Sequence, residues 1–234
     1  MSLIIAENLS KIYTNGEITV EALKGLTFEI EPSSFISFIG PSGSGKTTLL
    51  NLIGCLDIPT SGTLTVSGTE VSSLEKKDAA SFRGENIGFV FQDFNLIPVL
   101  TVYENVEYPL LMVQKVPSKD RRSQVLSLLD SVGMLKQENK YPDQISGGQK
   151  QRVAIARALV THPRLVLADE PTANLDHETA YMVINIMKEI MHESGTTFIF
   201  STHDQKIVSE VETIYTLEDG KLTGKNIQGE SDYV

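Results

Sequence analysis

The chain has 234 residues, of which 41% are hydrophobic and 21% are charged, and its formal net charge is −10. This length and composition suit one compact α/β domain with a large core. The acidic charge disfavours nonspecific binding to nucleic acid or anionic lipid, so we expect no nucleic-acid partner, although local positive charge can still bind a nucleotide.

The sequence has no feature typical of a secreted or membrane-spanning protein. Its first residues, Met1–Glu7, lack the basic region and apolar core of a signal peptide. No apolar stretch approaches the ~20 residues of a membrane span. We therefore expect a cytosolic chain, and any membrane crossing would belong to another chain. The single cysteine, Cys55, allows neither a disulfide framework nor a zinc site, and we expect it to be a buried small hydrophobe.

The first third of the chain contains short strands separated by turns. The candidate strands are Ile4–Asn8, Glu21–Glu31 and Thr63–Val66, and turn residues occur at Ser61–Gly62 and Ser67–Gly68. This spacing predicts an antiparallel sheet in the N-terminal part.

A glycine-rich octapeptide lies between an apolar run, Phe35–Ile39, and a segment with helical spacing, Thr48–Ile53. It fits the pattern of a phosphate-binding loop, in the strand–loop–helix context which that loop requires. The glycines let backbone N–H groups surround phosphate oxygens, Lys46 adds a full positive charge, and Thr47 adds a hydroxyl for Mg²⁺. A plain glycine turn is the alternative. The loop consists of Gly40, Pro41, Ser42, Gly43, Ser44, Gly45, Lys46 and Thr47.

Four apolar runs are predicted to be buried strands, and each leads into residues that could carry chemistry. Ligands bind beyond the carboxyl ends of the strands in open α/β sheets, so we expect these residues at one edge of a sheet. Polar residues also commonly end strands, which is the alternative for any single run. The runs are Phe35–Ile39, which leads to the octapeptide; Ile87–Phe91, which leads to Gln92; Leu165–Ala168, which leads to Asp169 and Glu170; and Thr197–Ser201, which leads to His203.

Asp169 and Glu170 are adjacent on an extended chain, so their side chains should point to opposite sides and can have different roles. One carboxylate suits Mg²⁺, directly or through water, and the other can orient and deprotonate an attacking water. An acidic pair that caps the following turn at Pro171–Thr172 is the alternative.

The pattern changes to helices between Asp93 and Tyr141. Ser118 is predicted to cap a helix with an apolar stripe, and a second helical segment, Thr101–Met112, is expected to be broken by Pro109. We therefore expect a helical insertion into the α/β core. The stripe consists of Val125, Leu128, Leu129 and Val132.

Ser146 and Gln149 have the spacing of a capping box at the start of another helix. A local capping role does not explain Gly147 and Gly148, because glycine in the first turn costs helix stability. Glycines there would expose N–H groups to a closely approaching anion. If that anion is a phosphate, the segment must approach it from another side than the octapeptide, or from another subunit.

The end of the chain contains a predicted hairpin turn at Glu218–Lys221. The residues after it, 226–234, are expected to form a loose tail.

Taken in order, the motifs resemble those of the nucleotide-binding subunit of ABC transporters. The resemblance covers essentially the whole chain and is strongest to the ATPases of the lipoprotein-release and macrolide-export group, through Gly54–Asp57, Phe89–Gln92 and Asn95–Pro98. Ile145 stands where the signature usually has leucine, a change that keeps size and apolarity. The motifs are Gly40–Thr47, Gln92, Ile145–Gln149, Leu165–Glu170, Ala173–Asp176 and His203.

The resemblance implies an α/β fold: a P-loop NTPase core with a mostly parallel sheet, an N-terminal antiparallel β subdomain and an inserted α-helical subdomain. Residues 1–234 would form one domain. Within it, 1–92 and 160–225 would make the core, and 93–159 would make the insertion with the signature motif.

The resemblance also implies an ATPase with ATP and Mg²⁺ as its cofactors. Tyr13 would stack on the adenine ring, and the loop Gly40–Thr47, together with Thr48, would hold the phosphates. Thr47, Gln92 and Asp169 would serve Mg²⁺. The catalytic residues would be Lys46, Gln92, Glu170 as general base and His203 at the γ-phosphate. Ser146, Gly147, Gly148 and Gln149 would reach ATP bound to a second copy of the chain, and Asp176 would lie across the same interface.

By the same resemblance, the chain would be peripheral on the inner face of the cell membrane, with its helical insertion docked on an integral permease. Some apolar residues could form the docking groove, although at least half of them could instead fill the core of the insertion. The resemblance does not decide between export and mechanical work on the envelope. It also does not decide between a homodimer and a heterodimer. The groove residues would be Leu96, Ile97, Val99, Leu100, Tyr108, Leu110, Leu111 and Met112.

Two other classes of protein are alternatives. A soluble ABC-type protein of DNA repair or translation would resemble two tandem units, or one unit split by a coiled coil or a zinc insertion, and the chain has none of these. A P-loop kinase would transfer phosphate to a small molecule, but it has no need for Ser146–Gln149.

Overall fold

The computed structural model describes residues 1–202 and 208–227. His203 and the predicted tail beyond Ile227 lie outside the described residues. In the part that is described, no helix is both long and apolar enough to cross a membrane.

The N-terminal part forms the predicted antiparallel sheet, whose strands lie in the order β2-β1-β4-β5. They are β1 (Ile4–Asn15), β2 (Ile18–Ile30), β4 (Ser61–Val66) and β5 (Thr69–Glu70). Because β1 and β2 pair from Ile4↔Ile30 to Asn15↔Ile18, β1 runs seven residues past the predicted Ile4–Asn8, and β2 begins three residues before the predicted Glu21. Their far ends lack the buried alternation on which that prediction depended.

A second sheet has six strands in the order β10-β9-β3-β8-β7-β6. The four predicted buried runs are its neighbouring strands β3, β8, β7 and β6, and each pair of neighbours among them is parallel. Their carboxyl ends therefore meet at one edge, as expected. The bounds are β3 (Phe35–Ile39), β6 (Ile87–Val90), β7 (Leu165–Asp169), β8 (Thr197–Thr202), β9 (Thr213–Glu218) and β10 (Lys221–Ile227).

These four strands read as continuous apolar runs because both faces of the sheet are covered. Along β8, Phe198 and Phe200 point into a core shared with the helices, whereas Ile199 points into a core shared with the antiparallel sheet. Along β7, Val166 joins the first core and Leu167 the second. This alternation fixes the strand register, since a slip by one residue would exchange the two faces.

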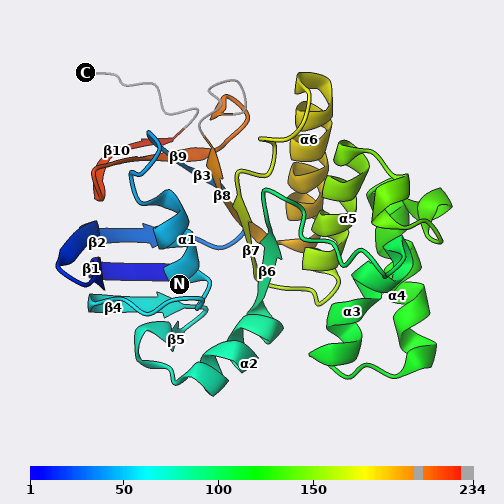
Figure 1. Ribbon diagram of the computed structural model, residues 1–234, viewed down its shortest axis with the longest axis horizontal. Coiled ribbons are helices and arrows are strands. Elements are labelled where there is room, and N and C mark those ends of the chain that lie inside the picture. Colours follow the sequence, from blue (N-terminus) through cyan, green and yellow to red (C-terminus); the bar gives the residue numbers. More distant parts are fainter. Residues whose placement is uncertain (203–207, 228–234) are drawn as a thin grey trace.

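Helices gather on the side of the second sheet that lies opposite the antiparallel sheet (Figure 1). The exceptions are α1, which follows β3, and α2, which precedes β6 and was not predicted. The helices are α1 (Lys46–Ile53), α2 (Lys76–Asn86), α3 (Val102–Met112), α4 (Ser118–Ser131), α5 (Gly147–Leu159) and α6 (His177–Ser194), with short 3₁₀ turns at Val71–Ser73, Leu135–Gln137 and Pro142–Gln144.

Pro109 does not break α3, so that prediction is wrong. The helix begins with a capping box formed by Thr101 and Glu104, and it buries Val102, Val106 and Leu110 completely. Burial of this row outweighs the one backbone hydrogen bond that proline removes.

Ser118 is not the cap of α4, which is also a correction. The cap is Pro117, whose carbonyl accepts the amides of Asp120 and Arg121. Ser118 is therefore the first residue of the helix, where the prediction placed its cap. The hairpin turn at Glu218–Lys221 is confirmed by the antiparallel pair β9–β10. Because β10 continues to Ile227, residues 226 and 227 are strand and not tail.

The predicted fold class is thus confirmed: an α/β fold with a mostly parallel sheet, an antiparallel N-terminal sheet and an inserted group of helices.

Candidate functional site

The phosphate loop joins β3 to α1 at the predicted edge of the second sheet. Gly45 precedes α1 with φ +106, and a Cβ atom there would lie 2.6 Å from the carbonyl oxygen of Ala22. Gly40, at φ +150, would place a Cβ atom against the carbonyl of Leu217. Glycine is required at both positions because the backbone conformation and the neighbouring chain each exclude a side chain.

Lys46, the first residue of α1, folds back over the loop. Its Nζ donates to the carbonyl oxygens of Gly40, at 2.8 Å, and Pro41, at 3.0 Å, and the residue is only 8% exposed. An ammonium group has three donors, so these two bonds place the charge at the mouth of the loop without using all of its hydrogen-bonding capacity.

Thr47 and Asp169 face each other beside the loop. The hydroxyl of Thr47 lies 3.0 Å from Oδ2 of Asp169 and donates to that carboxylate. Ser201, at the end of β8, donates to the other oxygen of Asp169 at 2.6 Å and accepts the backbone N–H of Glu170 at 3.0 Å. Sequence reasoning treated Ser201 only as the end of an apolar strand; a polar residue in such a run was the available signal.

Glu170 follows β7 with φ +48, a left-handed conformation that is rare for a residue with a side chain. The bond from its N–H to Ser201 helps to hold this turn. The turn separates the two carboxylates: Asp169 faces Thr47, and Glu170 lines the adjacent cavity together with Gln92.

The cavity has a volume of about 720 Å³. It brings together the phosphate loop, Gln92 and Glu170, as predicted from the strand ends, and it adds residues of β2 and of the β9–β10 turn that sequence reasoning missed. One of these additions, Val20 of β2, is an apolar residue that lines the cavity and is nevertheless 54% exposed. The lining consists of Val20, Glu21, Ala22, Lys24, Ser42, Gly43, Gly45, Lys46, Thr47, Thr48, Gln92, Glu170, Asp219 and Gly220.

Tyr13 lies on β1 directly opposite Val20. It does not itself line the cavity, but cross-strand partners have side chains on the same face of a sheet, so the ring is next to a lining residue. Its hydroxyl donates to Oδ2 of Asp57 at 2.7 Å, and 41% of the residue is exposed. Stacking of Tyr13 on adenine stays a prediction.

The Ser146–Gln149 segment forms the start of α5, away from this cavity. Both bonds of the predicted capping box are present: Ser146 Oγ accepts the amide of Gln149 at 3.3 Å, and Gln149 Oε1 accepts the amide of Ser146 at 2.9 Å. Gly148 also has a packing reason, since a Cβ atom there would collide with the side chain of Thr179. Gly147 has no such constraint, because its nearest neighbour would be 3.8 Å away.

Asp176 caps α6 beside this segment. Its carboxylate accepts the amide of Thr179 at 3.0 Å and the hydroxyl of Thr179 at 2.6 Å, and these bonds lower the pKa of Asp176 below its usual value. The predicted role across an interface is compatible with this local one and is not tested by it.

The loop after Gln92 is tied to α5 and to the segment after Glu170. Asn174 Nδ2 donates to the carbonyl of Gln92 at 2.9 Å. The guanidinium of Arg157, on α5, donates to the carbonyls of Phe94, at 2.8 Å, and Asn95, at 2.6 Å. Burial lowers the pKa of Arg157. This arginine was not predicted, and it connects the Gln92 loop directly to the helix that carries Ser146 at its start.

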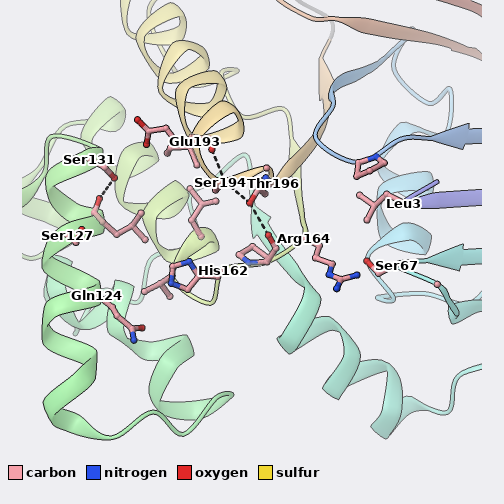
Figure 2. Close-up of a pocket in the computed structure, with 18 of the residues that line it drawn as sticks. Leu3, Ser67, Gln124, Ser127, Ser131, His162, Arg164, Glu193, Ser194 and Thr196 are labelled. Atoms are coloured by element: carbon pink, nitrogen blue, oxygen red, sulfur yellow. Dashed lines mark hydrogen bonds between the residues drawn. The ribbon is translucent and has the colours of Figure 1, made fainter. Parts of the chain in front are cut away.

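A larger cavity, of about 950 Å³, lies at the opposite end of the second sheet. Figure 2 shows Gln124 and Ser127 of α4 on one side of it, Leu3 and Ser67 on the other, and Arg164, just before β7, between them. None of the predicted site residues lines it. Size alone therefore does not identify the site; the convergence of the phosphate loop with Gln92 and Glu170 does.

Comparison with known proteins agrees with this geometry. A family model described as ABC transporter matches residues 23–173. An uncharacterized ABC transporter ATP-binding protein of Thermotoga maritima is 45% identical over 94% of this chain and 93% of its own. The lipoprotein-releasing system ATP-binding protein LolD of Bordetella pertussis is 39% identical over 93% of this chain and 94% of its own.

The fold also matches a solved structure, that of the ATP-binding cassette MJ0796 from Methanocaldococcus jannaschii, as a dimer in a post-hydrolysis state bound to ADP and Pi. The TM-score is 0.88 at 40% identity, over 96% of this chain and 98% of that one. The chain therefore belongs to the ABC transporter family, as an ATP-binding cassette with ATPase activity.

Proposed function

We propose that the chain binds MgATP between its own phosphate loop and the Ser146–Gln149 segment of a second copy, hydrolyses it, and thereby drives a membrane permease. The supporting observation is which residues line the cavity and which do not. Lys46, Thr47 and Glu170 line it, whereas the glycines at the start of α5 do not. The dimeric form of the related cassette MJ0796 also supports this arrangement.

The oxygens beside the loop fit a magnesium ion. Thr47 Oγ1 lies 3.0 Å from a carboxylate oxygen of Asp169, and the side chain of Gln92 lines the same cavity. Mg²⁺ commonly binds one or two carboxylates together with substrate phosphates. When bound here by Thr47, Gln92 and Asp169, it would neutralise charge on the phosphates.

Different residues of the chain would bind the phosphates and activate the attacking water. Lys46 and the loop amides hold the β- and γ-phosphates, and the ammonium stabilises charge that develops on the γ-phosphate. Glu170 accepts a proton from the attacking water as general base. His203, outside the described residues, would contact the γ-phosphate.

The second copy supplies the other wall. Unpaired amides at the start of a helix bind anions, and the glycines of α5 let the backbone come close to a phosphate. Ser146 and Gly148 would thus reach ATP held by the first copy, and Asp176 would lie at the same interface.

The permease would dock on the helical insertion, on the inner face of the membrane. Val99, Tyr108, Leu111 and Met112 are between 41% and 79% exposed, which suits contact with a partner helix. Leu110 is completely buried and belongs to the core of the insertion, so it is not available for docking. The likeness to LolD favours an export or envelope-lipoprotein type of permease.

Two substitutions test the shared site. Glu170→Gln should leave ATP binding intact but stop hydrolysis, so that a dimer accumulates when ATP is added, as measured by light scattering on a sizing column. In that background Ser146→Arg should prevent the dimer without weakening ATP binding by the monomer. Normal turnover of the first variant would exclude Glu170 as the base, and a dimer of the double variant would exclude the segment from the site.

A further inference from the structure

Lys11, Tyr13 and Asp57 form a hydrogen-bonded group beside the nucleotide cavity, which we call the Asp57 group. The carboxylate of Asp57 accepts the ammonium of Lys11 at 2.6 Å through one oxygen and the hydroxyl of Tyr13 at 2.7 Å through the other. The backbone N–H of Ile58 donates to the carboxylate at 2.7 Å. Three donors therefore converge on one acidic side chain.

Asp57 is negatively charged, as an acceptor of three hydrogen bonds should be. Burial alone would raise its pKa, but the bonds from Lys11, Tyr13 and the amide of Ile58 hold the pKa below its usual value. The side chain is thus an ionised acceptor at neutral pH, and hydrogen bonds to a charged acceptor are stronger than neutral ones.

The group fixes the ring of Tyr13 in position and in orientation. Asp57 holds the hydroxyl, and the Nζ atom of Lys11 lies over the ring, 4.9 Å from its centre. The ring is also next to two residues that line the cavity, Val20 across the strand pair and Thr48, which interacts with the hydroxyl. An adenine ring would therefore meet a tyrosine that is already oriented.

Asp57 also connects the ring to the phosphate loop. It follows α1, and its amide donates to the carbonyl of Asn51 on that helix at 3.3 Å. The same helix begins at Lys46, so Asp57 is bonded to the element whose first residue belongs to the phosphate loop.

We propose that Asp57 is a positioning residue for the nucleotide base, which acts through the hydroxyl of Tyr13 with support from Lys11. The inference rests on the proposed binding of ATP and on the prediction, from the family resemblance, that Tyr13 stacks on the adenine ring. Holding a surface ring in its bound orientation before the ligand arrives reduces the entropy lost on binding. The competing explanation is that the group only ties β1 to the loop after α1.

The first test compares a ligand that has a base with one that does not. MgATP and inorganic tripolyphosphate are titrated into the full chain by calorimetry. Asp57→Ala should weaken ATP at least threefold and leave tripolyphosphate unchanged. Asp57→Asn should retain part of the ATP affinity, because its amide oxygen can still accept from Tyr13. Equal weakening of both ligands would overturn the proposal.

The second test asks whether the effect passes through the hydroxyl. Tyr13→Phe should weaken ATP about as much as Asp57→Ala does, and the double variant should be no weaker than either single one. Additive losses would mean that Asp57 does not act through Tyr13. Asp130→Ala, at an exposed position on α4, is the control for removal of an acidic side chain. Urea unfolding of every variant shows that each is folded when titrated.

These experiments distinguish a failure of Tyr13 as the stacking residue from a failure of Asp57 as its positioning residue. If the unaltered chain binds ATP no more tightly than tripolyphosphate, the predicted stacking of Tyr13 on adenine fails. If it prefers ATP, Tyr13→Ala removes the preference, and Asp57→Ala retains it, then only the role of Asp57 fails.

Discussion

Ser201 lies near the end of β8 with its hydroxyl between the carboxylate of Asp169 and the backbone of Glu170. The residue is completely buried, so neither bond can be replaced by bulk water. One hydroxyl thus orients the carboxylate proposed for Mg²⁺ and holds the left-handed turn at Glu170, the proposed general base. Sequence patterns miss it, because Ser201 and Asp169 are 32 residues apart and meet only across a strand pair.

Ser201→Ala should reduce kcat roughly tenfold to a hundredfold, because small displacements of catalytic groups have effects of that order. It should also lower the free energy of unfolding by about 1–3 kcal/mol, since the N–H of Glu170 and the carboxylate of Asp169 each lose a buried hydrogen bond. KM for ATP should change little, because the phosphate loop is untouched. Steady-state phosphate release and urea unfolding measure these quantities.

Ser37→Ala is the matched control for this prediction. Ser37 is equally buried on the neighbouring strand β3, but its hydroxyl has no hydrogen-bond partner among the described residues. The substitution should leave kcat and stability nearly unchanged. An equal loss in both variants would mean that the serine at β8 matters for packing and not for its two bonds.

At the scale of elements, α5 and α6 begin side by side, with Gly148 of the first helix against Thr179 of the second. Thr179 is in turn bound by Asp176. The glycine pair that suggested an anion site therefore has two explanations. Gly148 allows the two helices to pack closely. Gly147 has free space above it, so the argument that its backbone could be approached by an anion still applies there.

Gly148→Ala should destabilise the fold by about 1–3 kcal/mol, because the new methyl group forces the two helix starts apart. Gly147→Ala adds the same methyl group where the nearest atom is 3.8 Å away, and alanine is the better helix former, so it should leave the free energy of unfolding unchanged or raise it. If Gly147→Ala nevertheless weakens the ATP-dependent dimer, the backbone there approaches a ligand or partner. Equal unfolding midpoints for the two variants would contradict the packing role of Gly148.

The strands and the site edge could be predicted because their signal is local. Buried parallel strands have continuous apolar runs, and their ends carry the chemistry, as at Asp169 and Glu170. The helix through Pro109 could not be predicted, because its stability comes from the burial of Val102, Val106 and Leu110 against other elements. Arg157 was missed for a similar reason: its carbonyl partner on Asn95 lies 62 residues away.

At the scale of the whole molecule, the chain has one phosphate loop and one Ser146–Gln149 segment, and these line different surfaces. A closed symmetric pair would contain two composite sites, each with one contribution from either copy. Arg157 links the loop after Gln92 to α5, the helix that Ser146 caps, so hydrogen bonds join the elements of the two proposed half-sites within a chain.

Mixing two inactive variants tests this division of the site. Lys46→Ala removes the phosphate-binding charge and Ser146→Arg blocks the segment of the second copy, so each variant alone should lose nearly all ATPase activity. A mixed pair still contains one intact site, made from the loop of the Ser146→Arg chain and the segment of the Lys46→Ala chain. Phosphate release should therefore rise above the sum of the separate variants as the proportions approach equality.

The same mixture in the Glu170→Gln background should form an ATP-dependent dimer that neither variant forms alone. This second measurement counts assembled sites even if turnover needs both of them. Activity and dimer content that stay at the sum of the parts at every ratio would show that each chain completes its own site. In that case the start of α5 would act as a capping element alone, and the phosphate loop would work without a partner.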